Sequence, residues 1–367
     1  MRVIVIGTRG IPNIQGGVET HCEELYPRMV KLNYRVHLIR RTCYVPVEDH
    51  LTEFKGVELS NLFTVRRITI ETILHTFLAV LYARKKGTDI LHVHAIGPAI
   101  FIPMARMLGM KVVFTHHGPD YNRAKWGPVA KLVLKFGERW GTAWANEVIV
   151  ISEVIKELLK EKYKRTDTHL IFNGVSPAIL SNKTDFIESL GLEPRKYVFT
   201  LGRFVEEKGF DYLIKAFKKI DQLGFRLVIA GDADHEIPYT KHLKKLAGMN
   251  NVVLPGFVKG EELHQLFTHA RLFVLPSFHE GLPISLLEAM SYKLPVLVSD
   301  IPANKQVALP GNTFFVTGDE TSLIKSLENI LQKDFTPIDY DMSLYDWDKI
   351  ALQTDAIYQK VLKSKRK

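Results

Sequence analysis

The sequence predicts an α/β protein of two domains, each built on a doubly wound parallel β-sheet. Its 367 residues are more than one ordinary hydrophobic core needs. Short β-branched runs alternate with helical stretches, a pattern typical of a parallel sheet with helices on both faces. The alternation stops in a polar stretch near the middle of the chain and then begins again. We therefore expect two domains of the same class.

The first block of alternation predicts an N-terminal Rossmann-like domain over residues 1–175. The expected strands are the β-branched runs at residues 3–6, 36–39, 90–94, 112–115 and 148–151. The expected helices are at residues 19–32, 69–86 and 127–143.

The second block predicts a C-terminal Rossmann-like domain over residues 196–342. Its expected strands are at residues 197–201, 227–230, 252–254, 272–275 and 295–298, and its expected helices are at residues 210–220, 261–270 and 284–291. Residues 176–195 are expected to be a linker, because turn formers cluster at 173–177 and a polar stretch without strand pattern follows. Residues 343–367 contain an amphipathic pattern from Trp347 to Leu362, which predicts a C-terminal helix.

Composition and charge narrow the function classes. The chain is 46% hydrophobic and 24% charged, as soluble globular proteins are. Residues 1–180 hold 25 Lys and Arg against 16 Asp and Glu, whereas residues 181–367 hold 24 of each. The positive half indicates an anionic partner, either a membrane surface, a nucleic acid or a charged substrate; the alternative is a solvated basic surface. We expect no nucleic acid, because no binding module with clustered aromatics on a basic strand is recognisable.

Cysteine content and hydropathy favour a cytoplasmic protein. Cys22 and Cys43 are too few for a disulfide framework or a zinc cluster. We expect no signal peptide, because glycines soon follow the first apolar run. The apolar stretch 73–83 is too short to span a bilayer and contains His75. We expect a cytoplasmic protein that can associate peripherally with the inner face of the cell membrane.

A glycine loop from Gly7 to Glu19 joins the first strand to the first helix. Gly16 and Gly17 open that helix, and backbone amides at a helix N-terminus attract phosphate. The loop is neither GxGxxG nor a Walker motif. We interpret it as a ligand loop; the alternative is an ordinary strand-to-helix turn.

Two cations follow the first strand of the second domain. Arg203 and Lys208 lie in the loop from Gly202 to Gly209, at the strand end where open α/β sheets bind ligands. Preorganised cations there would stabilise a departing diphosphate. The alternative is a charged surface turn.

A third signal follows the expected strand 272–275. Glu280 lies in the loop and Glu288 about two turns away in the next helix, and Gly281 and Leu282 place backbone amides at that helix start. Glu280 could then accept hydrogen bonds from sugar hydroxyls and Glu288 from a ribose diol. The alternative is that Glu288 only decorates an amphipathic helix.

These three motifs, in this order, resemble the retaining glycosyltransferases of the GT-B fold, family 4 (group 1). The resemblance covers nearly the whole chain, and the opening to Glu24 is similar to a bacterial rhamnosyltransferase-like subgroup. It implies two Rossmann-like domains facing each other across a cleft, with the last helix crossing back to the first domain. It also implies retention of anomeric configuration, with the diphosphate oxygen helping to remove the acceptor proton.

The resemblance implies a role for each matching residue. Arg203 and Lys208 would bind and stabilise the diphosphate, Glu280 would hold the donor sugar, and Glu288 the ribose. The expected donor-binding set is Gly16, Gly17, Arg203, Lys208, Phe257, Val258, Glu280, Gly281, Leu282, Pro283 and Glu288. The expected catalytic set is His117, Arg203, Lys208 and Glu280, with His117 near the anomeric carbon. The expected acceptor-side residues are His94, His116 and Asp120.

We expect no metal and no cofactor besides the nucleotide-sugar donor. His92, His94, His116 and His117 come without a well-placed carboxylate and fit no familiar zinc spacing. Asp232 and Asp234 resemble a cation-binding motif of another glycosyltransferase fold, but we interpret them as loop residues at the edge of the donor site.

The expected function is transfer of a sugar from a nucleotide-sugar donor to a glycan or lipid-linked acceptor, in cell-surface polysaccharide or glycolipid synthesis. The alternatives are a sugar-nucleotide epimerase or phosphorylase on the same scaffold, and a basic nucleic-acid-binding protein.

An anionic membrane surface is a further expected partner. Arg123 and Lys125 precede Lys131 and Lys135, which share a helix face, and Trp126 and Trp140 flank that stretch. The alternative is that Phe136 and Trp140 face the sheet as core.

Overall fold

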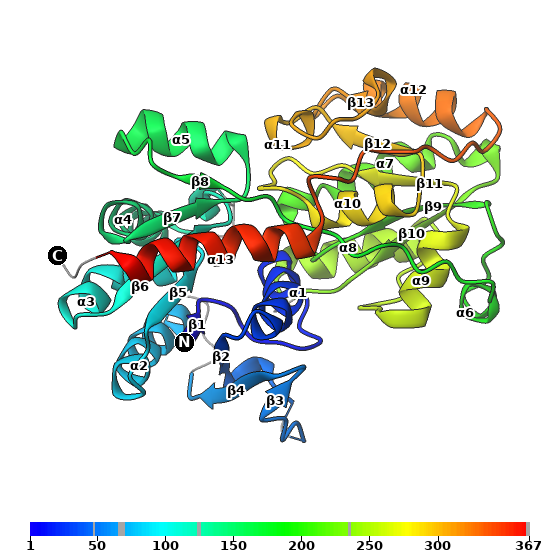
Figure 1. The fold of residues 1–367 in the computed structure, drawn as a ribbon. Coiled ribbons are helices and arrows are strands. Elements are labelled where there is room, and N and C mark those ends of the chain that lie inside the picture. Colours follow the sequence, from blue (N-terminus) through cyan, green and yellow to red (C-terminus); the bar gives the residue numbers. More distant parts are fainter. Residues whose placement is uncertain (47, 65–69, 123–125, 234–235, 365–367) are drawn as a thin grey trace. The chain divides into compact units, whose positions relative to one another are not determined.

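The computed structural model describes residues 1–46, 48–64, 70–122, 126–233 and 236–364, which form two compact units (Figure 1). Unit 1 comprises Met1–Gly174 and Tyr345–Lys367, and unit 2 comprises Val175–Leu344. Each unit is a parallel sheet with helices on both faces, so the predicted fold class is confirmed. Arg123, Lys125 and Asp234, named above, lie outside the described residues.

The sheet of unit 1 has the strand order β3-β4-β2-β1-β5-β6-β7-β8. Its strands are β1 (Arg2–Ile6), β2 (Arg35–Arg41), β3 (Glu53–Phe54), β4 (Val57–Leu62), β5 (Ile90–His94), β6 (Lys111–His116), β7 (Glu147–Val150) and β8 (His169–Leu170). All neighbours pair in parallel except β3 and β4. The sequence patterns missed β4 because Ser60 and Asn61 interrupt its apolar run.

Helices cover both faces of this sheet. They are α1 (Gly17–Lys31), α2 (Glu71–Lys85), α3 (Ile102–Met107), α4 (Pro128–Trp144), α5 (Glu153–Tyr163) and α13 (Trp347–Lys363). α1 and α13 share one buried apolar cluster with Val3, Val5 and Val113 of the strands. Neighbouring strand residues point to opposite faces, so the buried Ile4 and Phe114 face the other helix layer, where α2 contacts β1 and α3 contacts β6.

Helix α13 belongs to unit 1 although it comes from the end of the chain (Figure 1). Trp347 and Tyr358 are buried in the same cluster as α1. The Asp346 side chain caps the helix by accepting from the backbone amides of Asp348 and Lys349. The C-terminal segment therefore completes the core of the first sheet.

The sheet of unit 2 has the order β10-β9-β11-β12-β13. Its strands are β9 (Tyr197–Leu201), β10 (Arg226–Ala230), β11 (Leu272–Leu275), β12 (Val296–Ser299) and β13 (Phe314–Phe315). Its helices are α6 (Asp185–Ser189), α7 (Phe210–Lys218), α8 (Pro238–Met249), α9 (Gly260–His269), α10 (Ile284–Ser291), α11 (Pro302–Lys305) and α12 (Glu320–Leu331). The strand expected at 252–254 is reduced to one bridge between Val228 and Val253.

Both faces of the second sheet are also buried. Val198 and Val274 lie in an apolar cluster with residues of α7, α8 and α12. On the opposite face, the ring of Phe267 from α9 packs against Phe199 and Phe273, with centroids 5.0 and 6.0 Å away. Unit 2 thus has three layers, with the sheet between two layers of helices. The loops that follow the strand ends lie at the edge of the sheet.

The segment expected to be a linker, 176–195, is instead a packed part of unit 2. Ile187 and Leu192 are buried, and the backbone amide of Phe186 donates to the Gln265 side chain at 2.9 Å. Ser181 donates its backbone amide to Thr268 at 3.1 Å. The polar composition of this segment concealed the few apolar residues that attach it.

Candidate functional site

Two loops meet at the carboxyl edge of the second sheet, because they follow the neighbouring strands β9 and β11. The backbone amide of Phe278 donates to the carbonyl of Glu207 at 2.8 Å, which joins the loops directly. Gly209 has a φ of +64°, and a Cβ there would lie 2.5 Å from the carbonyl oxygen of Pro276. Only glycine allows this close approach without strain.

The joined loops bring Lys208 and Glu280 together. Lys208 Nζ lies 2.6 Å from Glu280 Oε1, and the Ser277 hydroxyl donates to the same oxygen at 2.6 Å. The Lys208 and Glu280 side chains are only 17% and 11% exposed. Arg203 lies in the same loop as Lys208 and is partly buried. A fixed cation and a fixed carboxylate at this edge suit recognition of a phosphate and of a hydroxyl-bearing group.

The start of helix α10 lies beside this pair in the chain. Leu282 and Pro283 are buried, and Pro283 is the N-cap, so the free amides of the first turn follow it. The Gln306 side chain donates to the carbonyl of Gly281 at 3.3 Å and holds the turn. Glu288 lies in the second turn of α10 and is partly buried.

Two further residues of the expected donor-binding set, Phe257 and Val258, lie in the loop before α9. Phe257 is 42% exposed and Val258 is buried. The backbone amide of Gly231 donates to the carbonyl of Gly256 at 2.7 Å, which fixes this loop to the end of β10. Asp232 forms an ion pair with Lys244 at 3.0 Å.

In unit 1 the glycine loop is filled by its own helix. The carboxylate of Glu19 accepts from the backbone amide of Arg9 at 3.0 Å and from the Thr8 hydroxyl at 3.2 Å. A Cβ on Gly16 would lie 2.1 Å from that carboxylate, whereas Gly17 has open space. Glu19 therefore takes up donors of the loop that a phosphate would otherwise use.

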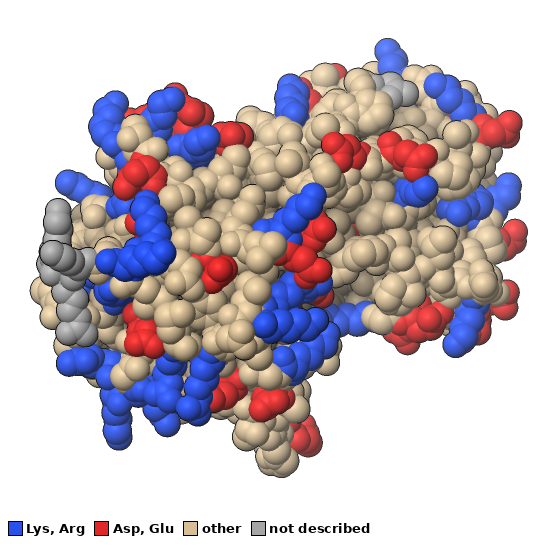
Figure 2. Space-filling view, in the orientation of Figure 1, with Lys and Arg blue, Asp and Glu red and all other residues tan. Residues whose placement is uncertain are grey.

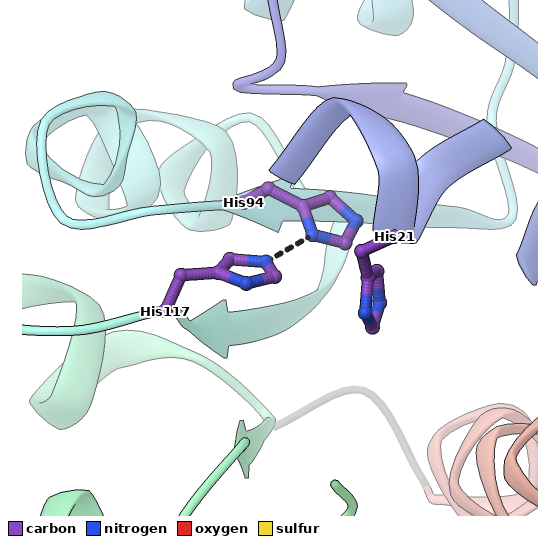
Figure 3. A group of neighbouring side chains, drawn as sticks. All are labelled: His21, His94 and His117. Atoms are coloured by element: carbon purple, nitrogen blue, oxygen red, sulfur yellow. Dashed lines mark hydrogen bonds between the residues drawn. The ribbon is translucent and has the colours of Figure 1, made fainter. Parts of the chain in front are cut away.

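Three histidines meet at the carboxyl edge of the first sheet (Figure 3). His94 is the last residue of β5, His117 follows β6, and His21 lies in α1. His94 Nδ1 and His117 Nε2 are 2.9 Å apart. We expected His94 on the acceptor side and His117 in the catalytic set, but His21 was not among the expected site residues; its signal is its place just after the glycine loop.

Hydroxyl and amide groups hold these rings. His21 Nδ1 contacts Asn173 Oδ1 at 3.1 Å, and the Tyr26 hydroxyl contacts both His94 Nε2 and His92 Nδ1. Both nitrogens of His92 are bound to hydroxyls, with Tyr358 at 2.6 Å and Thr115 at 2.7 Å. Nothing in the residue spacing indicated these partners, which come from four separate segments.

The histidines of this cluster are neutral near pH 7. Burial lowers the pKa of His21 to about 4 and that of His92 to about 3. Burial and the neighbouring imidazoles lower the pKa of His94 and of His117 well below the ordinary value. Each ring therefore offers one N–H donor and one lone pair.

His116, expected on the acceptor side, is instead buried and structural. Its Nε2 lies 3.0 Å from Glu138 Oε1, and its Nδ1 accepts from the backbone amide of Gly118 at 3.1 Å. Burial alone would raise the pKa of Glu138, but hydrogen bonds from His116, Lys162 and Tyr163 lower it to about 2. With both nitrogens in use, His116 positions the loop that carries His117. Asp120, three residues on, is partly buried.

Helices α2 and α4 carry exposed apolar side chains. On α4 these side chains recur every three or four residues and are 39% to 76% exposed: Val129, Leu132, Phe136, Trp140 and Trp144. Phe136 and Trp140 are therefore not core residues. Ile73, Phe77 and Leu81 of α2 are about equally exposed, and both helices pack against the turn Pro98–Phe101.

Among the described residues, no helix combines the length and the apolar character needed to cross a bilayer.

Basic side chains gather on the same unit. Figure 2 shows a group of them over the part of unit 1 where α2 lies, and the last turn of α2 holds Arg84 and Lys85. On α4, Lys135 and Arg139 are exposed between the apolar positions. Unit 1 thus presents apolar and basic groups on neighbouring elements.

Two family models match the chain in succession. Residues 15–179 match the model described as Glycosyltransferase Family 4, and residues 182–343 match the one described as Glycosyl transferases group 1. The two matches meet close to the boundary between unit 1 and unit 2.

Relatives of known or assigned class are similar over much of the chain. An uncharacterized glycosyltransferase of Methanocaldococcus jannaschii is 25% identical over 98% of each chain. The UDP-Gal:alpha-D-GlcNAc-diphosphoundecaprenol alpha-1,3-galactosyltransferase of Escherichia coli is 34% identical over 60% of each chain.

Solved structures share the fold. A sucrose-phosphate synthase from Thermosynechococcus elongatus superposes with a TM-score of 0.82 at 20% identity, over 98% of each chain. HepE of Anabaena in complex with UDP-glucose gives a TM-score of 0.73 at 16% identity, over 98% of this chain and 95% of that one. At these identities the likeness bears on the fold alone.

Proposed function

We propose a donor, an acceptor and a stereochemical course for this chain, which is a glycosyltransferase of the group 1 and family 4 type with the GT-B fold. It transfers a hexose from a UDP-sugar to a lipid-linked glycan acceptor with retention of anomeric configuration. The product belongs to cell-surface polysaccharide or glycolipid synthesis.

The observation that carries the donor proposal is the ion pair of Lys208 with Glu280. Ser277 adds a hydroxyl to the same carboxylate, so both charges are held before any donor arrives. In the proposed complex the β-phosphate takes the Lys208 ammonium, and Arg203 adds a second cation. Glu280 then accepts from hydroxyls of the donor sugar.

The other donor contacts follow from helix α10. The backbone amides after Gly281 and Leu282 receive the diphosphate at the helix N-terminus. Glu288 accepts from the ribose diol, and Phe257 and Val258 frame the base. The uridine is favoured by the UDP-Gal in the name of the Escherichia coli relative.

Charge development explains why these groups would accelerate transfer. As the glycosidic bond breaks, negative charge grows on the leaving diphosphate, and fixed cations stabilise that charge without reorganisation. The acceptor oxygen attacks the same face, and the departing diphosphate oxygen takes its proton. The neutral His117 imidazole donates a hydrogen bond near the anomeric carbon. This set needs no metal cofactor.

The acceptor proposal rests on unit 1. Helix α4 presents an apolar face bordered by Lys135 and Arg139, and tryptophan and basic residues favour the interface of an anionic bilayer. The Escherichia coli relative is named for a diphosphoundecaprenol-linked acceptor. We infer that unit 1 docks peripherally on such a membrane to reach its acceptor.

The test is a transfer assay with the full chain. Radiolabelled UDP-glucose, UDP-galactose and UDP-N-acetylglucosamine are each incubated with undecaprenyl-diphosphate-linked sugar in anionic vesicles. We expect label in the lipid extract with one donor, and proton NMR of the product should show the donor's anomeric configuration.

Two results would contradict the proposal. A water-soluble glycan is added in a parallel assay. Label that enters this glycan, and with every donor stays out of the lipid extract, would exclude the lipid-linked acceptor. Conversion of a donor in the absence of acceptor would indicate the epimerase alternative instead.

A further inference from the structure

Unit 1 holds a group of three imidazoles whose nitrogens face one another. One nitrogen each from His21, His94 and His117 lies within 4.8 Å of the other two. Figure 3 shows the three rings converging from a helix and from the ends of two neighbouring strands. The His21 ring centroid is 5.5 Å from that of His94 and 5.0 Å from that of His117.

The surrounding hydrogen bonds decide which nitrogens point inward. An amide oxygen can only accept, so the contact with Asn173 Oδ1 places the His21 proton on Nδ1. The other ring nitrogen of His21, Nε2, therefore keeps its lone pair. The Tyr26 hydroxyl engages His94 Nε2, so Nδ1 is the atom that faces His117. Oxygen partners on the outer nitrogen orient the ring in the same way in metal-binding histidines.

The cluster is also largely buried and uncharged. His94 has no exposed surface and His21 is 3% exposed. The indole of Trp347 packs against His21, with the two ring centroids 5.4 Å apart. Burial keeps all three imidazoles in the neutral form near pH 7, which is the form that binds metals.

We propose that His21, His94 and His117 bind one divalent transition-metal ion such as Zn²⁺. Three imidazoles suit Zn²⁺, Ni²⁺ or Cu²⁺ and not the oxygen-preferring Mg²⁺ or Ca²⁺. The fourth position is left for water or an anion, as in zinc sites with three protein ligands.

Binding requires the three nitrogens, which now lie within 4.8 Å of one another, to adjust to the spacing of metal ligands. Nitrogens that share a zinc ion are about 3.4 Å apart at ordinary bond lengths, compared with 2.9 Å between His94 and His117 here. His117 is partly exposed and follows the end of its strand, so it can shift by this amount. The proton now between the two rings moves to the outer nitrogen of the same imidazole that carries it, so that both rings stay neutral.

The ion would inhibit transfer. A His117 nitrogen that coordinates a metal no longer serves the donor, so activity falls as the site fills. This consequence, unlike the binding itself, rests on the role proposed above for His117.

The test uses tag-free full-length protein and two histidine variants. Co²⁺ is titrated into wild type while its visible absorption is followed, and Zn²⁺ then displaces it. We expect one equivalent of each ion and an intense spectrum of four- or five-coordinate Co²⁺. His21→Leu should weaken Zn²⁺ binding by at least roughly 10-fold, and His242→Leu, at an exposed position on α8, should leave it unchanged.

The outcomes separate the site from its consequence. Absence of stoichiometric binding, or equal affinity in wild type and a folded His21→Leu, overturns the site. If His21→Leu does not fold, X-ray absorption of Zn²⁺-loaded wild type decides, since fewer than three imidazole ligands would overturn it. Stoichiometric binding without inhibition would leave the site intact and contradict the role of His117.

Discussion

Lys208 Nζ lies 2.6 Å from Glu280 Oε1, although the two residues are 72 positions apart in the sequence. The carboxylate holds the ammonium in place, and in the proposed donor complex the diphosphate takes over that contact. The pair therefore connects the two loops that we assign to the diphosphate and to the donor sugar.

Lys208→Ala should reduce kcat by roughly 10²–10³, the usual cost of removing one group that stabilises transition-state charge. The steady-state rate with UDP-sugar measures this, and thermal unfolding checks that the variant is folded. Lys215→Ala on α7 is the matched control, because that lysine is exposed and its ion pair with Asp211 is long, at 3.7 Å. A rate within a few-fold of wild type would exclude Lys208 from the reaction.

Glu288→Ala should weaken binding of free UDP by roughly 10- to 100-fold, because a hydrogen bond to a charged group contributes about 1.5–3 kcal/mol. Calorimetric titration of UDP measures the Kd directly. Glu262→Ala on α9 is the control, since that side chain is exposed. Equal affinity of wild type and Glu288→Ala would contradict the ribose assignment.

Glu138→Gln should destabilise unit 1 by about 3 kcal/mol, because it removes a buried carboxylate that pairs with Lys162 at 2.6 Å. Urea unfolding at pH 7 measures the change, with Glu157→Gln, an exposed partner of Lys160, as the control.

The pH dependence of this effect has a definite sign. The folded pKa of Glu138 is about 2, below its ordinary value of 4.5. The carboxylate therefore stabilises the fold above pH 4.5, and that stabilisation is lost as the pH falls toward 2. We expect a smaller difference between wild type and Glu138→Gln at pH 3.5 than at pH 7. A constant difference would show that the charge of Glu138 is not what stabilises the fold.

Anionic vesicles should co-sediment with the protein at low salt and release it as ionic strength rises, because basic side chains contribute part of the attraction. The double variant Phe136→Glu and Trp140→Glu should bind several-fold less, since it places charge on the apolar face of α4. Leu352→Glu on α13, also at an exposed apolar position, is the control. Absence of binding at low salt would indicate a soluble acceptor.

Activity should survive EDTA, because Arg203 and Lys208 supply the charge that a divalent cation would otherwise supply. If protein is isolated with Zn²⁺ on the three histidines, EDTA should raise its activity. Complete loss, restored by Mg²⁺ or Mn²⁺, would contradict metal independence and direct attention to Asp232, which pairs here with Lys244.

The sequence by itself determined the fold class and identified the loops that we propose bind the donor. Strand and helix periodicities are local properties, so α10 was predicted at its exact bounds and β5 likewise. Ligand loops follow strand ends in open α/β sheets, and for that reason Lys208 and Glu280 could be assigned before their contact was known.

Only the tertiary structure decided which side chains meet. The order β1-β5-β6 brings α1 beside two strand ends, and His21 thereby joins His94 and His117. The same packing turned His116 inward toward Glu138 and left Phe136 and Trp140 outside. Residue spacing along one chain carries no information on the order of strands in a sheet or on the side of a helix that a neighbour covers. Those depend on long-range burial of apolar surface, which is a property of the folded molecule.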